Sequence, residues 1–184
     1  MTLDDLLPDA RLHLPGAPDI LIKDHLRQSL IRFCRDTHAW REELTPVYPV
    51  KGVSRYYLDL PAGSEVVAVR SATQGGQPVR VDLNVFGLMT LPKLNSQAPV
   101  TVVAVLQPTA TTNDIPERLV SHHRQGLVSG AIETLVTMPK QEWSNPPSAE
   151  YHAQQYAYHV GQAKIRAAAG ESDQPLTVTM HPFI

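Results

Sequence analysis

The sequence predicts an α+β protein: a helical bundle of three main helices, an inserted antiparallel β region, and extended N- and C-terminal arms. Apolar residues recur at helical spacing in three segments, at about 19–39, 115–138 and 148–169. Between about 44 and 109 the pattern changes to short apolar runs separated by turn residues. A chain of 184 residues can bury a substantial core. We therefore expect a single domain that spans residues 1–184.

The N-terminal arm is expected over residues 1–17, because Pro8, Pro15 and Gly16 interrupt any regular element there. No basic region precedes an apolar run, so a secretory signal is not expected. The first helix follows, and its apolar stripe consists of Ile22, Leu26, Leu30, Phe33 and Cys34.

The β region is predicted from five short runs, which read RYYLDL, EVVAVRSAT, PVRVDLNVF, GLMTL and PVTVVAVL. Gly75-Gly76 predicts a tight hairpin, because both glycines tolerate the positive φ of a primed turn. Pro61 to Gly63, Pro92 and Asn95-Ser96 indicate further turns.

The second helix is expected to begin after Asp114, a candidate N-cap with Glu117 three residues later. Pro139 would end it, and Gly170 would cap the end of the third helix. Each of these two helices carries a row of small residues spaced by four, which favours close backbone approach in an antiparallel hairpin. The rows are Gly126 and Gly130 on the second helix, and Ala153, Ala157 and Gly161 on the third.

Two tryptophans at helix ends, Trp40 and Trp143, are predicted to be structural anchors, together with Gly126, Gly130 and Gly161. Trp143 lies in the connection MPKQEWSNPPSAEY between the second and third helices. The alternative is that Trp143 binds a ligand, which would then be another protein subunit. If Trp143 is buried, its indole N–H should find a carbonyl.

The C-terminal arm, residues 171–184, alternates apolar and polar side chains in the manner of a strand with no local partner. Such a segment could close the inserted sheet or add a strand to a neighbouring protein. The residues of this arm that are expected to contact another copy of the chain or a neighbouring protein are Leu176, Val178, Met180, Pro182 and Phe183.

Catalytic chemistry is not expected. Cys34 and His38 lie four apart on a predicted helix, so a thiol–imidazole pair is conceivable, but Cys34 continues the apolar stripe. His122 and His123 are adjacent and would point about 100° apart, so they do not suit one metal ion. We expect no catalytic, cofactor or metal site.

The tyrosines of the third helix have two interpretations. Tyr151, Tyr156 and Tyr158 could form an aromatic ligand face, although the spacing of seven between Tyr151 and Tyr158 favours core or interface packing. His152 and His159 are also seven apart, too far for one metal ion. Solvated or hydrogen-bonded surface histidine is the preferred interpretation for these two and for His122 and His123.

The charge balance sets limits on partners. Sixteen Lys and Arg against eighteen Asp and Glu give a net charge of −2, so only passing contact with double-stranded DNA is expected. The single cysteine fits a reducing compartment, and the most apolar run is too short to span a bilayer, so no membrane contact is expected.

Three blocks of the sequence carry a family resemblance. They are FCRDTHAWREEL (33–44), RYYLDLPAGSEVVAVRSATQGGQPV (55–79) and SGAIETLVTMPKQEWSNPPSAEYHAQQYAYHVGQAKIRAAAG (129–170). In these blocks the chain resembles the head-to-tail connector proteins of tailed bacteriophages, also called adaptor or head-completion proteins. The resemblance covers most of the chain except its two arms, and it rests on packing and turn patterns.

The resemblance implies a non-enzymatic structural protein of the virion, made in the host cytoplasm and located in the neck. It implies a homo-oligomeric ring of twelve copies beneath the portal protein, which extends the DNA channel and docks a neck, tail-tube or nozzle protein. The alternatives are another neck or tail component, such as a stopper, tail-completion or tail-tube adaptor protein, and a small cytoplasmic enzyme that uses Cys34 and His38.

Overall fold

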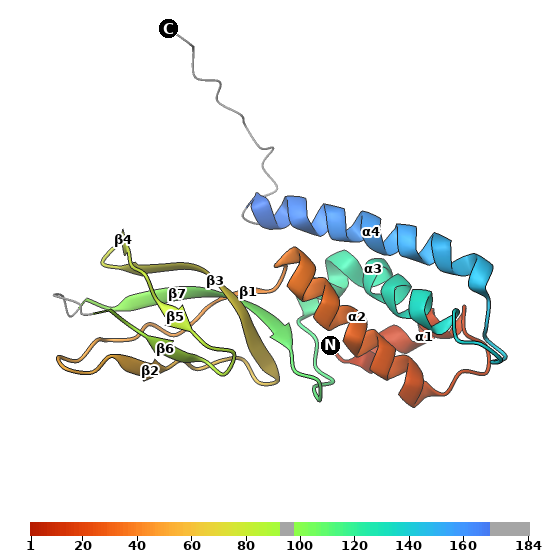
Figure 1. Cartoon of the computed structure of the whole chain (residues 1–184), viewed down its shortest axis with the longest axis horizontal. Coiled ribbons are helices and arrows are strands. Elements are labelled where there is room, and N and C mark those ends of the chain that lie inside the picture. Colours follow the sequence, from red (N-terminus) through yellow and green to blue (C-terminus); the bar gives the residue numbers. More distant parts are fainter. Residues whose placement is uncertain (93–97, 170–184) are drawn as a thin grey trace, which may run out of the picture.

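The computed structural model confirms the α+β class, with helices at one end of the molecule and the β region at the other (Figure 1). It describes residues 1–92 and 98–169. The three main helices are α2 (Asp19–Thr37), α3 (Glu117–Leu135) and α4 (Pro146–Ala168). The expected boundaries differ from the observed ones by at most three residues, which is usual at helix ends.

The helix α2 forms because its apolar stripe repeats every three to four residues and faces α3 and the β region. It ends at Thr37, whose hydroxyl donates to the carbonyl of Phe33. His38 then adopts a left-handed conformation with φ 55°, and its backbone N–H donates to the carbonyl of Cys34. This left-handed cap turns the chain out of the helical layer toward the first strand.

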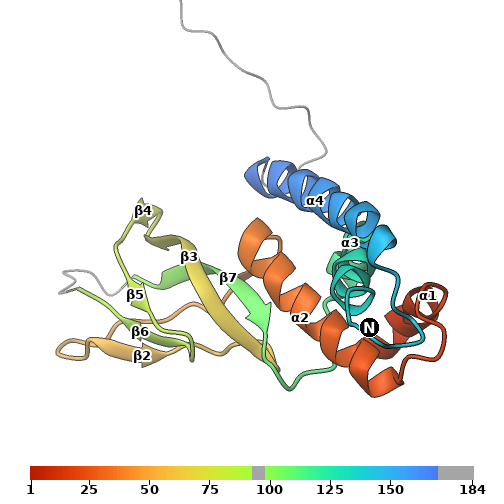
Figure 2. The ribbon, with the colours of Figure 1, turned by 45° about the vertical axis from the view of Figure 1, so that its right-hand side comes forward.

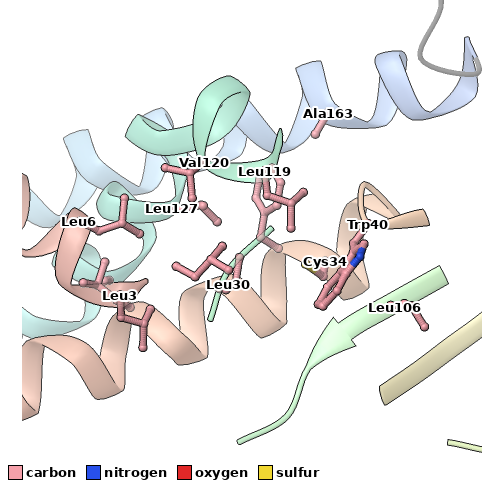
Figure 3. Close-up of a cluster of buried hydrophobic side chains, with 14 of the residues drawn as sticks. Leu3, Leu6, Leu30, Cys34, Trp40, Leu106, Leu119, Val120, Leu127 and Ala163 are labelled. Atoms are coloured by element: carbon pink, nitrogen blue, oxygen red, sulfur yellow. The ribbon is translucent and has the colours of Figure 1, made fainter. Parts of the chain in front are cut away.

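The N-terminal arm is not extended, which corrects the expectation for residues 1–17. It forms a 3₁₀ turn η1 (Leu3–Leu6) and a short helix α1 (Leu7–Arg11). Pro8 falls in the first turn of α1, where its missing N–H costs no helical hydrogen bond. Leu3 and Leu6 are buried beside Leu30 and Leu127, and Figure 3 shows these side chains together. The free energy gained by burying these leucines outweighs the tendency of the prolines to interrupt a regular element.

The expected N-cap at Asp114 is also wrong, and the cause is the same N-terminal segment. Thr2 and Asp114 form an isolated antiparallel bridge, and the N–H of Ile115 donates to the carbonyl of Met1. Residues 113–115 are therefore drawn into an extended pairing. The helix α3 begins only at Glu117, with Pro116 at the N-cap position.

The β region consists of two antiparallel sheets (Figure 2). The larger has the order β1-β7-β3-β4, and the smaller has the order β2-β6-β5. The strands are β1 (Arg41–Glu43), β2 (Arg55–Tyr57), β3 (Ser64–Gln74), β4 (Gln77–Pro78), β5 (Asp82–Leu83), β6 (Leu88–Thr90) and β7 (Val100–Pro108).

Two turns in this region bear on the expectations. Gly75 and Gly76, with φ of 56° and 81°, make the predicted tight turn between β3 and β4. The Asn95-Ser96 turn lies outside the described residues, as do Gly170 and the whole C-terminal arm with its expected contact residues Leu176, Val178, Met180, Pro182 and Phe183.

The strand β7 joins the two halves of the molecule. It pairs with β1 and β3 along its edges and packs against α2, so it is buried along most of its length. Trp40 is 4% exposed beside this junction; its carbonyl accepts a hydrogen bond from the N–H of Leu106, and its indole Nε1 donates to Glu42 at 3.1 Å. Cys34, Trp40 and Leu106 lie together at this junction in Figure 3.

The helices α3 and α4 form the expected antiparallel hairpin, and glycines set how closely they approach. A Cβ on Gly126 would lie 2.4 Å from Cβ of His159, and one on Gly130 would lie 2.6 Å from Cδ2 of Tyr156. The predicted partner row is wrong: Gly161 is exposed, with nothing within 4 Å of where its Cβ would be. The α3 glycines accommodate large rings of α4, not small residues.

Replacement of Gly130 by Ala should destabilise the fold, because the added methyl group would also meet Oγ of the buried Ser29 at 2.4 Å. We expect a loss of about 1–3 kcal/mol in the free energy of unfolding. Gly161→Ala is the matched control: it adds the same methyl group in open space and should stabilise α4 by about 0.5–1 kcal/mol. Urea unfolding of both variants measures this, and shifts of the same sign would contradict the packing described.

Candidate docking surfaces

The Cys34 thiol is shielded from reaction. Its side chain is fully buried, and burial raises its pKa to about 12, with the nearby Arg118 acting in the opposite direction. His38 is exposed and bonds to Cys34 through the backbone N–H. A thiolate nucleophile needs a lowered pKa and access to solvent. The geometry of Cys34 therefore gives the enzyme alternative no support.

The histidines near α4 occupy packing positions. His152 is 4% exposed, in edge-to-face contact with His13 at 5.0 Å between ring centroids, which corrects the expectation of a surface residue. His123 is also buried, against Phe33, which corrects the same expectation for that residue, whereas His122 is exposed. Within the described ranges, no three His, Cys, Asp or Glu side chains are grouped so that they could hold a metal ion.

The pKa of His123 is lowered to about 4, chiefly because burial disfavours the charged imidazolium. The positive charges of Arg166, His122 and His159 act in the same direction. Its Nδ1 has no hydrogen-bond partner among the described residues. His123 therefore stays neutral at pH 7 and serves as part of the apolar contact between α2, α3 and α4.

Arg32 also joins α2, α3 and α4. Its guanidinium lies 4.2 Å from the ring centroid of Tyr156 and bonds to Glu133 at 3.1 Å and to the carbonyl of Gly130 at 3.3 Å. Stacking on the ring and these hydrogen bonds hold α2, α3 and α4 in one arrangement. This arrangement turns one face of α4 toward the solvent.

The outward face of α4 carries an uncharged row of side chains, and all of them are exposed. Tyr151, Tyr158 and Ile165 are 54%, 62% and 57% exposed. Figures 1 and 2 show α4 along the outside of the helical layer, with α3 beneath it. We call this row the α4 seam; it consists of Tyr151, Gln154, Tyr158, Gly161, Ile165 and Ala168.

A second set of exposed apolar side chains lies in the β region. Tyr57 is 79% exposed and pairs with Leu88, the first residue of β6. Phe86, 75% exposed, lies in the turn that precedes β6, at the same end of the smaller sheet. The segment between β1 and β2 adds Tyr48, Val50 and Val53, and it reaches the end of the molecule farthest from the helices (Figure 1). We call these five residues the β surface.

Each set holds several large apolar side chains that are about half exposed or more. Because exposed apolar groups that lie close together often mark an interaction site, we take both sets as candidate docking surfaces. The sequence indicated part of the α4 seam through the spacing of Tyr151 and Tyr158, but it did not include Ile165. The β surface was missed, because exposure of Tyr57 and Phe86 depends on how the two sheets close on each other.

The two tryptophans that were expected to be structural anchors differ in their surroundings. Trp40 is buried at the junction of helices and sheet. Trp143 packs against the core from the α3–α4 connection, but its indole Nε1 has no hydrogen-bond partner among the described residues, so the expected carbonyl contact is wrong. The connection is held instead by its backbone, through a hydrogen bond from the N–H of Asn145 to the carbonyl of Val136 at 2.9 Å.

No protein-family model matches the chain, and no curated protein sequence matches it. Among residues 1–92 and 98–169, no helix has both the length and the apolar composition that a bilayer crossing requires.

Acidification should destabilise the protein through His123. An unfolded histidine has an ordinary pKa near 6.5, whereas folded His123 has a pKa of about 4. Between these values the folded state binds fewer protons, so its stability is complete above pH 6.5 and falls by up to about 3 kcal/mol as the pH drops toward 4. Urea unfolding at pH 7 and at pH 4.5 measures this loss.

His123→Leu should show a smaller acid-induced loss, because it removes the buried base. His122→Leu, on the exposed neighbour, is the control and should keep most of the wild-type loss. An unchanged loss in His123→Leu would show that another group governs the acid response.

Proposed function

We propose that this chain is a structural protein of a bacteriophage virion, a head-to-tail adaptor that forms a ring beneath the portal and docks the neck or tail. The observation that carries the proposal is the separation of two exposed apolar surfaces on one folded chain, the α4 seam on the helices and the β surface on the inserted sheets. A subunit that joins two assemblies needs two such separate surfaces. The three sequence blocks that resemble connector proteins support the same function.

The resembling blocks coincide with the parts of the fold that set its geometry. Residues 33–44 include the left-handed cap of α2, Trp40 and β1. Residues 55–79 run from β2 to β4 and include the glycine turn. The last block contains Gly130, the connection with Trp143, and all of α4. The resemblance therefore concerns how the β region is inserted and how α4 lies on α3.

The charge of the chain agrees with this function. A channel through which DNA slides should not bind phosphates strongly, and a protein with a net charge of −2 has no excess of cations for such binding. Several arginines are also engaged within the fold, such as Arg27 with Asp24 and Arg124 with Asp9.

A different neck or tail component is the second candidate, because two docking surfaces would serve a stopper or tail-completion protein equally well. Mass measurement and image reconstruction of a purified portal and neck assembly distinguish them. A ring of this protein in direct contact with the portal supports the adaptor. Contact with the tail-tube protein alone supports the other component, and a protein absent from virions contradicts both.

The proposed portal attachment through the C-terminal arm gives a specific prediction. Deletion of residues 174–184 removes none of the described residues, so the truncated protein should fold with unchanged stability. It should no longer attach to portal-bearing heads, as measured by co-sedimentation. A full-length chain with the order of residues 174–184 shuffled is the control for length, and it should also fail to attach. Attachment by the truncated chain at the wild-type level would contradict a role for this arm.

A further inference from the structure

The α4 seam has the spacing of a coiled-coil interface. Its members follow one another at alternating intervals of three and four residues over almost the whole helix, about 26 Å. The buried side of α4, with His152, Tyr156, Ala163 and Ala167, already packs on its own fold. The seam is therefore a second packing face, and no described element of the chain covers it.

Bulky residues alternate with small or polar ones along the seam. Tyr151, Tyr158 and Ile165 are the bulky members, and the alternate positions hold Gln154, Gly161 and Ala168. Gly161 is flanked by open space, so a partner helix can come close there. Such a surface fits a partner helix on which the same pattern runs in reverse, because the bulky side chains of each helix then face the smaller residues of the other.

A second copy of α4 in antiparallel orientation is such a partner. With the two-fold axis midway between Tyr158 and Gly161, each Tyr158 faces Gly161 of the second copy. The same register sets Tyr151 against Ala168, and Gln154 against Ile165. Each layer then combines one large residue with a smaller one, which is how antiparallel helices fill their interface at close distance. We propose that the free protein pairs with a second copy through the α4 seam, antiparallel and in this register.

The charges of α4 favour the same orientation. Its only carboxylate, Glu150, lies in the first turns, and its Lys and Arg residues, Lys164 and Arg166, lie in the last turns. Antiparallel pairing brings the acidic end of one helix near the basic end of the other. A parallel pair would place like charges side by side, stack tyrosine on tyrosine, and leave gaps at Gly161.

This inference goes beyond the proposed function and does not depend on it. A two-fold contact closes on itself, so it cannot by itself build a ring of many copies. In the proposed pair, the α4 seam of the free protein is covered before assembly. The lateral contacts of a ring would then be made by other surfaces.

Cross-linking between single-cysteine positions tests orientation and register in the full-length protein. Gln154→Cys and Ile165→Cys both place the new thiol at an exposed position. The native Cys34 is buried, so the new thiols are the ones that react. A short bis-maleimide should link the two variants when they are mixed, because residues 154 and 165 face each other across the pair. Each variant alone should give little product, because the introduced thiols of its two paired copies would lie about 16 Å apart along the helix axis.

Two results of this experiment would overturn the proposal. Cross-linking of each variant with itself, without a gain on mixing, indicates parallel pairing. No cross-link in any sample indicates that the seam meets a different surface or none. The wild-type chain is the control and should give no product, because its single cysteine is buried.

Dissociation of the pair gives an independent measurement by analytical ultracentrifugation. Gly161→Leu should raise the dissociation constant at least tenfold, because a leucine would fill the gap that Tyr158 of the second copy occupies. The monomer should remain folded by circular dichroism, since nothing lies within 4 Å of that position. Lys140→Leu, on an exposed residue outside α4, is the control and should pair like the wild type. A monomeric wild-type protein, or a Gly161→Leu variant that pairs as tightly as the wild type, would overturn the proposal.

Discussion

The close approach of α3 to both α2 and α4 is the contact on which the helical half depends. Gly126 and Gly130 leave room for the rings of His159 and Tyr156, and the hydroxyl of Ser29 donates to the carbonyl of Leu127 across the same gap at 2.8 Å. Because the backbones are this near, Tyr156 lies in the interior with Arg32 stacked on its ring. A side chain at Gly130 would separate all three helices.

This contact also decides what α4 presents to the outside. A helix that packs on one neighbour through one face leaves its opposite face in solvent, and the side of α4 that holds Tyr156 and His152 is fixed by the α3 glycines. Tyr151, Tyr158 and Ile165 are exposed as a consequence. The exposure of the α4 seam therefore depends on the core, because packing at the buried side of α4 sets the rotation of this helix about its axis.

The β region is attached to the helices by a narrow set of contacts that include the N-terminus. The chain passes from α2 into the β region through residues 38–40 and returns to α3 through residues 109–116. In this second connection, the carbonyl of Asn113 accepts a hydrogen bond from the N–H of Leu3. Arg27 on α2 binds the carbonyl of Thr112 and the side chain of Asn113. Both connections are thus tied to the helical core. The proposed adaptor role requires such a linkage, because it keeps the α4 seam and the β surface in a defined relation.

The sequence by itself determined the class of fold, the three main helices and the glycine hairpin of the β region, because each depends on local periodicity or on a backbone conformation that only glycine readily adopts. It also indicated that α3 and α4 pack closely. Only the tertiary structure decided that residues 1–17 fold into the core, that rings of α4 and not its small residues meet Gly126 and Gly130, and that the seam faces outward. These outcomes depend on which surfaces are buried together by residues far apart in the chain, and local pattern carries no information on that choice.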